Sequence, residues 1–162
     1  PVLPTGVEVF NGHYSIGGWR MNGGGWDYTD FWTKCLDEGL KLFAYANDDY
    51  HDGAIDLNNG WNMVLVEAND PTSILDALKK GSSYASTGVK INAMHEYNGK
   101  IIVFTEGKVE GAFYTTNKKL LSQNYSDTFE IEYNGESYIR FEANDNGKKC
   151  WTQPFVSKES FT

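Results

Sequence analysis

The stretch that decides the fold of the first half of this chain runs from Lys41 to Asp52 and reads KLFAYANDDYHD. Its first part, Leu42–Ala46, is apolar and short enough to predict one buried β-strand. Its second part places Asp49 and His51 directly after that strand. Residues i and i+2 of an extended chain share a face, so we expect the carboxylate and the imidazole to point the same way. Oxygen and nitrogen ligands delivered in this manner suit zinc, manganese or iron.

Strand signals recur on both sides of this stretch. Val7–Phe10 predicts one strand and Met63–Val66 predicts another. Because strands that alternate with helices form parallel sheets, we expect three parallel strands covered by helices. Asn11 and His13 follow the first strand at its carboxyl end, so we expect them at the same mouth as the Asp-x-His pair.

Two helices are predicted, one between the first two strands and one after the third. The first begins at Asp27, which has the position of an N-cap, and ends at Gly39. The second begins at Asp70-Pro71 and ends at Gly81. The residues expected on the buried faces are Phe31, Trp32, Cys35 and Leu36 in the first helix, and Ile74, Leu75 and Leu78 in the second.

The segment Gly17–Gly25, between the first strand and the first helix, is rich in glycine. It lacks the glycine order of dinucleotide-binding loops and of phosphate-binding loops. With Trp19 and Trp26 in or beside it, this segment is interpreted either as a mobile lid or as a long connection.

From about residue 89 the hydrophobic pattern changes to a period of two. Alternating segments such as Phe129–Tyr133 and Tyr138–Glu142 are separated by Asn-Gly pairs, which accept the positive φ angles of tight hairpin turns. These pairs are Asn98-Gly99, Asn134-Gly135 and Asn146-Gly147. Residues 89–162 therefore predict an antiparallel sheet or small β-sandwich of about six or seven strands.

Composition excludes several classes of protein. The 162 residues are 40% hydrophobic and 15% aromatic, enough to form a core. The formal charge of -8 leaves no basic patch for duplex nucleic acid but is compatible with a divalent cation. No apolar run approaches the roughly 18 residues that would span a membrane. Cys35 and Cys150 are expected to be buried free thiols.

The first residue is Pro1 and not Met, so the natural start is expected to lie upstream. A cytoplasmic location is favoured, and export stays open. Among the other candidate residues, His95 is expected on the surface, and Glu8 either lines a barrel or pairs with a lysine. Asp48 and Asp52 either support the Asp-x-His pair or are solvated. No convincing serine or cysteine nucleophile motif is present.

Several motifs, taken in order along the chain, resemble the C-terminal part of a PHP (polymerase and histidinol phosphatase) domain. They are Gly6–Gly12, Trp26-Asp27, Ala46–His51, Gly60-Trp61, Ile74–Gly81 and Tyr84–Gly88. The tail is similar to the β module often appended to the phosphoesterase-like members of that family, through Tyr138–Glu142, Gly147 and Trp151–Pro154. The resemblance covers essentially the whole chain.

The resemblance implies that residues 1–88 are the C-terminal part of a distorted seven-stranded β/α barrel and residues 89–162 an antiparallel β-sandwich. It implies a di- or trinuclear site of divalent metal ions (zinc, manganese or iron), at which metal-activated water hydrolyses a phosphoester. Asp49 and His51 match the family's last metal-binding motif, and Asn11, His13 and Asp48 are possible site-lining residues. The family's opening His-x-His and its further His and Glu ligands are absent from this sequence, so they are expected in a missing N-terminal half of the barrel.

Two functions from different classes follow. The first is a fragment of a metal-dependent phosphoesterase that acts on a phosphorylated small molecule or a phosphodiester and is inactive alone. The alternative is a glycan- or protein-binding β module on a barrel remnant without catalysis. The aromatic residues available for such recognition, or else for core packing, are Tyr114, Tyr125, Tyr133 and Trp151. A third possibility is the family fold retained without activity.

Overall fold

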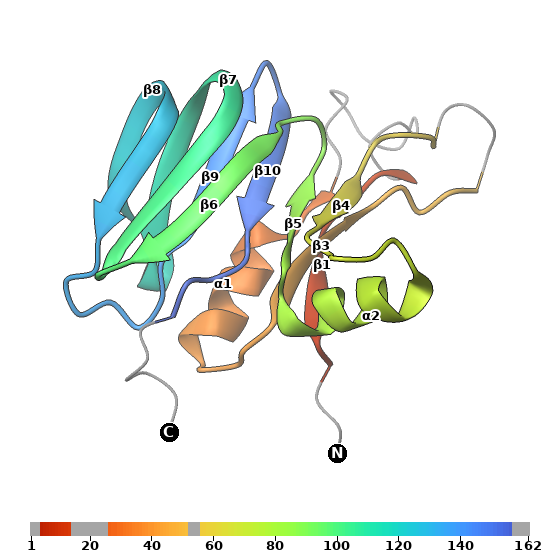
Figure 1. Cartoon of the computed structure of the whole chain (residues 1–162), viewed down its shortest axis with the longest axis horizontal. Coiled ribbons are helices and arrows are strands. Elements are labelled where there is room, and N and C mark those ends of the chain that lie inside the picture. Colours follow the sequence, from red (N-terminus) through yellow and green to blue (C-terminus); the bar gives the residue numbers. More distant parts are fainter. Residues whose placement is uncertain (1–3, 14–25, 52–55, 157–162) are drawn as a thin grey trace. The chain divides into compact units, whose positions relative to one another are not determined.

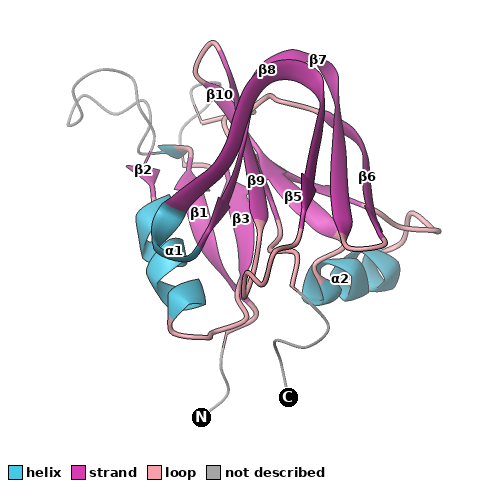
Figure 2. Cartoon of the chain, turned by 90° about the vertical axis from the view of Figure 1, so that its left-hand side faces the viewer, coloured by secondary structure: helices cyan, strands magenta, loops and turns pink. Residues whose placement is uncertain are grey.

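The computed structural model describes residues 4–13, 26–51 and 56–156, which form mainly strands (Figure 1). The chain divides into two units, Pro1–Thr87 and Gly88–Thr162. Both α-helices of the described residues belong to the first unit, and Figure 2 separates them by colour from the strands. The described part of the chain contains no helix that is both long and apolar enough to cross a membrane.

A mixed three-stranded sheet forms the centre of the first unit, in the order β2-β1-β3. β1 (Gly6–Asn11) and β3 (Phe43–Asn47) run parallel, which confirms the prediction for these two strands. β2 (Trp26–Asp27) pairs antiparallel with the end of β1. Val9 and Ala44 are fully buried, so the middle of this sheet belongs to the core.

The third predicted strand is not parallel to the first two. β4 (Trp61–Val64) pairs antiparallel with β5 (Ser83–Ser86), so the prediction of three parallel strands is wrong. The side chain of Asn62 explains why β3 needs no third parallel neighbour at this point. Its amide accepts a hydrogen bond from the Ala46 N–H (3.1 Å) and donates one to the Ala46 carbonyl (2.8 Å). One side chain thus satisfies both backbone groups of this β3 residue. The described residues of this unit close no barrel.

The second helix begins at its predicted N-cap, Asp70, whereas the N-cap of the first helix is Tyr28, one residue after the predicted Asp27. Asp27 accepts a hydrogen bond from the first N–H of α1 (Thr29–Asp37) at 2.9 Å. Asp70 accepts two from the first turn of α2 (Pro71–Lys80), at 3.0 Å each. Glycines with left-handed backbone follow both helices: Gly39 (φ 78°) and Gly81 (φ 74°).

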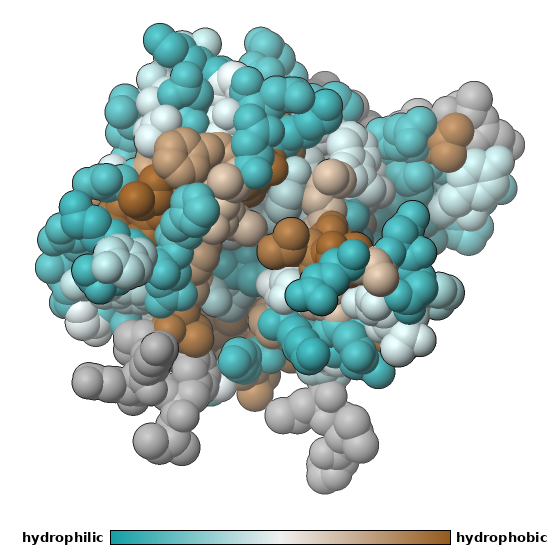
Figure 3. All heavy atoms as spheres, viewed as in Figure 1, coloured by the Kyte–Doolittle hydropathy of each residue, from teal (hydrophilic) through white to brown (hydrophobic). Residues whose placement is uncertain are grey.

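The buried face of each helix is narrower than its apolar pattern predicts. In α1, Trp32 is fully buried, whereas Phe31 is 57% exposed. In α2, Ala77 is the buried residue and Leu75 is 51% exposed. The predictions for Phe31 and Leu75 are therefore wrong. Successive helical residues are rotated by about 100°, so Phe31 and Leu75 project away from the buried Trp32 and Ala77. Hydrophobic atoms accordingly gather on the surface near β4 and α2 in Figure 3.

The second unit contains five strands within the described residues, fewer than the six or seven predicted, and every pair of neighbours is antiparallel, as predicted. They are β6 (Ile91–Tyr97), β7 (Lys100–Thr115), β8 (Lys119–Glu132), β9 (Arg140–Asp145) and β10 (Lys148–Thr152). β8 follows one side of β7, while β6 and β9 pair with different parts of its other side. β7 pairs with β6, β8 and β9, and β9 pairs with β10, so the five strands form one hydrogen-bonded sheet and the expected sandwich is corrected to a single bent sheet.

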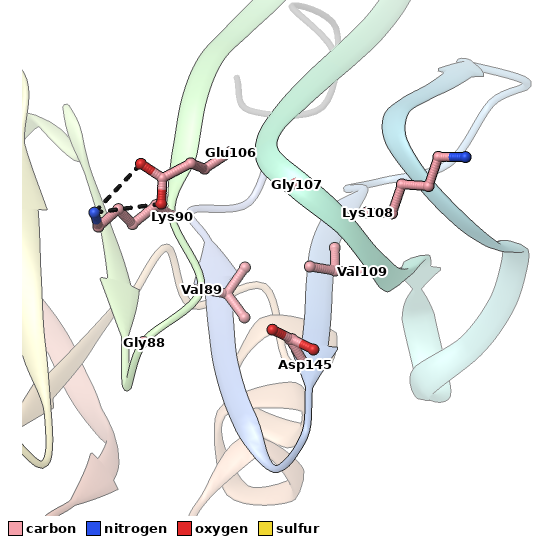
Figure 4. Close-up of a pocket in the computed structure, with 8 residues that line it drawn as sticks. All are labelled: Gly88, Val89, Lys90, Glu106, Gly107, Lys108, Val109 and Asp145. Atoms are coloured by element: carbon pink, nitrogen blue, oxygen red, sulfur yellow. Dashed lines mark hydrogen bonds and ion pairs between the residues drawn. The ribbon is translucent and has the colours of Figure 1, made fainter.

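β7 changes direction at Glu106–Lys108, between its pairing with β6 and its pairing with β9. A pocket of about 230 Å³ lies at this bend. Val89, Val109 and Asp145 point into the same gap in Figure 4, and Lys90 pairs with Glu106 beside them at 3.3 Å. The pocket therefore lies between the part of β7 that pairs with β6 and the part that pairs with β9.

Two of the three Asn-Gly pairs form the predicted hairpin turns. Asn98-Gly99 joins β6 to β7 and Asn146-Gly147 joins β9 to β10, with positive φ at all four residues. Asn134-Gly135 forms no hairpin, because it connects β8 to β9, which pair with opposite sides of β7. The β7–β8 hairpin turns instead at Asn117-Lys118, whose φ angles are 58° and 54°.

Aromatic rings form much of the core of the second unit. Phe113 and Phe129 both contact Phe141, with ring centroids 5.1 and 4.8 Å away. Gly111 makes room for this cluster, since a Cβ there would lie 2.4 Å from the ring of Phe129. Trp151 is fully buried in the same unit.

Candidate functional site

The candidate site lies at the carboxyl ends of β1 and β3. The two strands end in register, with Asn11 opposite Asn47. The N–H of Gly12 then donates to the carbonyl of Asn47 (2.8 Å), which extends the pairing by one residue. A Cβ on Gly12 would lie 2.7 Å from the Cβ of Asn59, so the close approach of these loops requires glycine. The loops that follow the two strands are thereby held side by side.

The side chains of Asp49 and His51 point toward each other, but not through the extended backbone that the prediction assumed. Oδ1 of Asp49 lies 3.0 Å from Nε2 of His51. Asp49 has a φ of 48°, a left-handed conformation that turns the chain sharply after β3. The side chains of His51 and Asp49 are 62% and 34% exposed, so a ligand from solvent can reach the pair.

Asn11 fixes the second oxygen of Asp49. Its buried amide donates to Asp49 Oδ2 and to Glu8 Oε2, both at 3.0 Å. The hydrogen bond from Asn11 is the main cause that lowers the pKa of Asp49, and the hydrogen bond with His51 acts in the same direction. Glu8 also accepts a hydrogen bond from the Asn47 amide (2.9 Å), so two amides hold its carboxylate.

A second histidine–carboxylate pair stands beside the first. Nδ1 of His13 lies 2.9 Å from Oδ2 of Asp56, and the same oxygen accepts the backbone N–H of His51 at 2.9 Å. Asp56 is 2% exposed. The rings of His13 and His51 are 4.6 Å apart between centroids. Asp56 therefore positions both histidines.

Asp56 is the site residue that sequence reasoning missed. It lies in a polar loop that also contains Asp48 and Asp52, and no spacing in the sequence distinguishes it from them. The only available signal was its proximity to the Asp-x-His pair. Asp52 and the glycine-rich segment Gly17–Gly25 lie outside the described residues.

Asp48 holds the loop that follows the candidate site. Its carboxylate accepts hydrogen bonds from the backbone N–H groups of Asn58 (3.0 Å), Asn59 (2.7 Å) and Gly60 (2.9 Å). Asp48 was predicted as a possible site-lining residue, and these three bonds show that its carboxylate closes the loop beside the site.

The fit of these residues to a metal ion is partial. Within residues 4–13, 26–51 and 56–156, no group of three or more His, Cys, Asp or Glu side chains is arranged to hold a metal ion. Asp49 and His51 offer two donors of suitable chemistry, whereas a protein zinc site commonly has about four ligands. Further ligands would have to come from outside the described residues.

The aromatic residues considered for recognition lie mostly inside the second unit. Trp151 is fully buried, and burial raises the pKa of both Tyr114 and Tyr133. Tyr125 is the exposed member of the four, at 65%. Trp151, Tyr114 and Tyr133 therefore pack wholly or partly in the interior, which leaves Tyr125 exposed.

His95 is exposed as predicted, whereas Cys35 is less buried than predicted and Glu8 is held by two amides instead of a lysine. His95 is exposed on β6, with its ring edge-on to Phe104. Both cysteines are free, and Cys150 is buried while Cys35 is partly buried.

Comparison of the chain with protein-family models, curated proteins and solved structures found no match. The described residues thus define a mixed α/β unit with two histidine–carboxylate pairs at the ends of its parallel strands, followed along the chain by an all-β unit.

Proposed function

We propose that this chain is part of a metal-dependent phosphoesterase in which Asp49 and His51 are ligands of a divalent cation. The observation that carries the proposal is the 3.0 Å approach of Asp49 Oδ1 and His51 Nε2 just beyond the ends of parallel strands. This edge of an α/β sheet is where functional residues gather. The mixed carboxylate and imidazole donors favour zinc, manganese or iron.

The residues around the pair support a role in positioning it. Asn11 holds one oxygen of Asp49 and leaves the other toward His51. Asp56 accepts the backbone N–H of His51 and also holds His13 next to it. Metal ligands commonly need such outer hydrogen bonds to keep their orientation.

A bound cation would lower the pKa of its water and neutralise charge on a phosphoryl group. Because the described residues offer two donors, the proposal includes further ligands, in a distorted barrel with a di- or trinuclear site. The substrate class is a phosphorylated small molecule or a phosphodiester. The exposed faces of Asp49 and His51 supply access for such a substrate.

Cation binding tests the ligand assignment directly. We expect weak Mn²⁺ binding by the chain, measured by electron paramagnetic resonance, and a loss of about tenfold or more in Asp49→Asn and His51→Ala. His95→Ala is the matched control, because it removes an exposed histidine from the other unit. Equal Mn²⁺ affinity in all three variants and the wild type would contradict the assignment.

Hydrolysis tests the reaction class. With Mn²⁺ or Zn²⁺ and a nitrophenyl phosphodiester, we expect no turnover by the 162 residues alone and turnover by a longer protein that supplies the remaining ligands. Robust turnover by the 162 residues that survives His51→Ala would argue against this site.

A further inference from the structure

The chain contains six Asn-Gly pairs, and the proposed function makes no use of their chemical reactivity. Asparagine followed by glycine readily loses its side-chain amide, because glycine has no Cβ to hinder attack by its own backbone nitrogen. Asn22-Gly23 lies outside the described residues. The pairs that the structure describes are Asn11-Gly12, Asn59-Gly60, Asn98-Gly99, Asn134-Gly135 and Asn146-Gly147.

Deamidation closes a succinimide ring within the pair. The glycine nitrogen bonds to the side-chain carbonyl carbon of asparagine, the side-chain carbon–nitrogen bond breaks, and ammonia leaves with the proton of the glycine N–H. Water then opens the ring at either carbonyl and gives aspartate or isoaspartate, so water is the co-reactant and no electrons are exchanged. The glycine N–H must therefore be available, and the asparagine backbone must rotate until the glycine nitrogen meets the side-chain carbon.

Three of the five described pairs have their glycine N–H in a hydrogen bond. These donors are Gly12 (to the Asn47 carbonyl, 2.8 Å), Gly60 (to Asp48 Oδ1, 2.9 Å) and Gly147 (to Asn144 Oδ1, 3.0 Å). Attack by these nitrogens first requires that the hydrogen bond breaks. Among the described pairs, Asn98-Gly99 and Asn134-Gly135 lack this protection.

Asn98-Gly99 is protected by its hairpin instead. Both residues have left-handed backbone, with φ of 51° and 75°, and the first cross-strand pair of β6 and β7 holds the turn closed. The carbonyl of Gly99 also accepts the N–H of Tyr133 (2.9 Å), which ties the turn to the end of β8. The rotation that deamidation needs therefore requires this turn to open.

Asn134-Gly135 has neither kind of protection. It lies in the connection between β8 and β9, where no cross-strand pair closes a turn, and Asn134 is not left-handed. Both residues are exposed. The N–H of Asn134 donates to Glu136 Oε2 (2.6 Å) and its side-chain amide donates to the Glu132 carbonyl (3.2 Å). Neither bond occupies the attacking nitrogen of Gly135.

We propose that Asn134 is a deamidation site of the folded chain, and that the other four described asparagines are protected by the fold. The product carboxylate adds one negative charge to the formal -8 and lies beside Glu136. It also cannot donate a hydrogen bond to the Glu132 carbonyl, as the Asn134 amide does. Isoaspartate further lengthens the main chain by one carbon between β8 and β9.

Peptide mapping of the full chain by mass spectrometry tests the site. During incubation at mildly alkaline pH, Asn134 should deamidate about tenfold or more faster than the other four described asparagines, whose reaction must await local opening. Incubation in ¹⁸O water marks ring opening and separates it from deamidation during digestion. In urea the five rates should converge. Equal rates in the folded chain, or a difference that persists in urea, would overturn the proposal.

A single variant tests the cause of protection. Asn144→Ala removes the acceptor of the Gly147 N–H, so Asn146 should deamidate about fivefold faster while Asn134 keeps its rate. Asn134→Gln is the control, because glutamine closes a larger ring more slowly; it should abolish the fast reaction and leave the rate at Asn146 unchanged. Equal acceleration of both sites by Asn144→Ala, or none at Asn146, would contradict the proposed protection.

Discussion

Asn11 is buried at the end of β1, and its amide joins the carboxylates of Glu8 and Asp49. At the scale of single residues, amides organise this site as much as charges do, because Asn47 also donates to Glu8. The approach of Asp49 and His51 was expected from alternation along an extended chain, but the structure reaches it through a left-handed Asp49 with a φ of 48°. Asp56 was not predictable in the same way. Its contacts with His13 and His51 depend on how the loops after β1 and β3 meet.

Removal of the Asn11 amide should destabilise the fold. We expect Asn11→Ala to lower the free energy of unfolding by about 1–3 kcal/mol, because two partly buried carboxylates lose a hydrogen-bond donor. Urea denaturation measures this change. Asn92→Ala is the control, since the amide of Asn92 is exposed and makes one long contact of 3.5 Å. A loss no greater than that of the control would contradict the role given to Asn11.

The lowered pKa of Asp49 predicts a pH dependence of stability. Its folded pKa lies below the ordinary value of 3.8, so the stabilisation is complete above that value and is lost as the pH falls through the folded pKa. Asp49→Asn should therefore flatten the acid limb of stability against pH. Carboxyl-carbon NMR of Asn11→Ala should show the Asp49 pKa rising toward its ordinary value, and an unchanged pKa would refute the stated cause.

At the scale of elements, the features predicted correctly from the sequence are those that depend on neighbouring residues. The N-cap of α2, the glycines that follow both helices and two of the Asn-Gly turns each depend on a few neighbouring residues, so the sequence was enough to place them. The orientation of β4 was not predictable, because β4 pairs with β5 in another sheet and touches β3 through the Asn62 amide. The Asn117-Lys118 turn escaped prediction because lysine carries no turn signal of its own.

The two glycines that follow the helices predict a graded pair of mutants. Gly39→Ala should cost about 1–2 kcal/mol, since its left-handed backbone disfavours a side chain but nothing lies within 4 Å of the added Cβ. Gly81→Ala should cost clearly more, because its Cβ would lie 2.4 Å from the ring of Phe43. Thermal or urea unfolding measures both. Equal decreases in the free energy of unfolding would mean that the Phe43 ring moves aside at no cost.

At the scale of the whole molecule, the change from alternating strands and helices to an all-β pattern was visible in the sequence, near residue 88. The arrangement of the second unit was not, because β7 receives β8 on one side and two different strands on the other. Pairings so distant along the chain leave only weak local signals, and a period of two is shared by a sheet and a sandwich.

Thiol labelling reports on the integrity of the second unit. Burial raises the pKa of the Cys150 thiol to about 12, so in the folded chain it should not react with a disulfide reagent at mild alkaline pH. Cys35 is only partly buried and should react first. Mass spectrometry should therefore find one labelled thiol before unfolding and two afterwards. Rapid labelling of Cys150 in the folded chain would show that the sheet opens readily.

The central claim is that Asp49 and His51 bind a divalent cation, and side-chain NMR of the three histidines during a Mn²⁺ titration tests it most directly. Mn²⁺ broadens the signals of nearby nuclei, and the His13 ring lies 4.6 Å from that of His51. We predict that His51 and His13 broaden at low Mn²⁺ while His95, in the other unit, stays sharp. Broadening of all three together, or of His95 first, would contradict the claim.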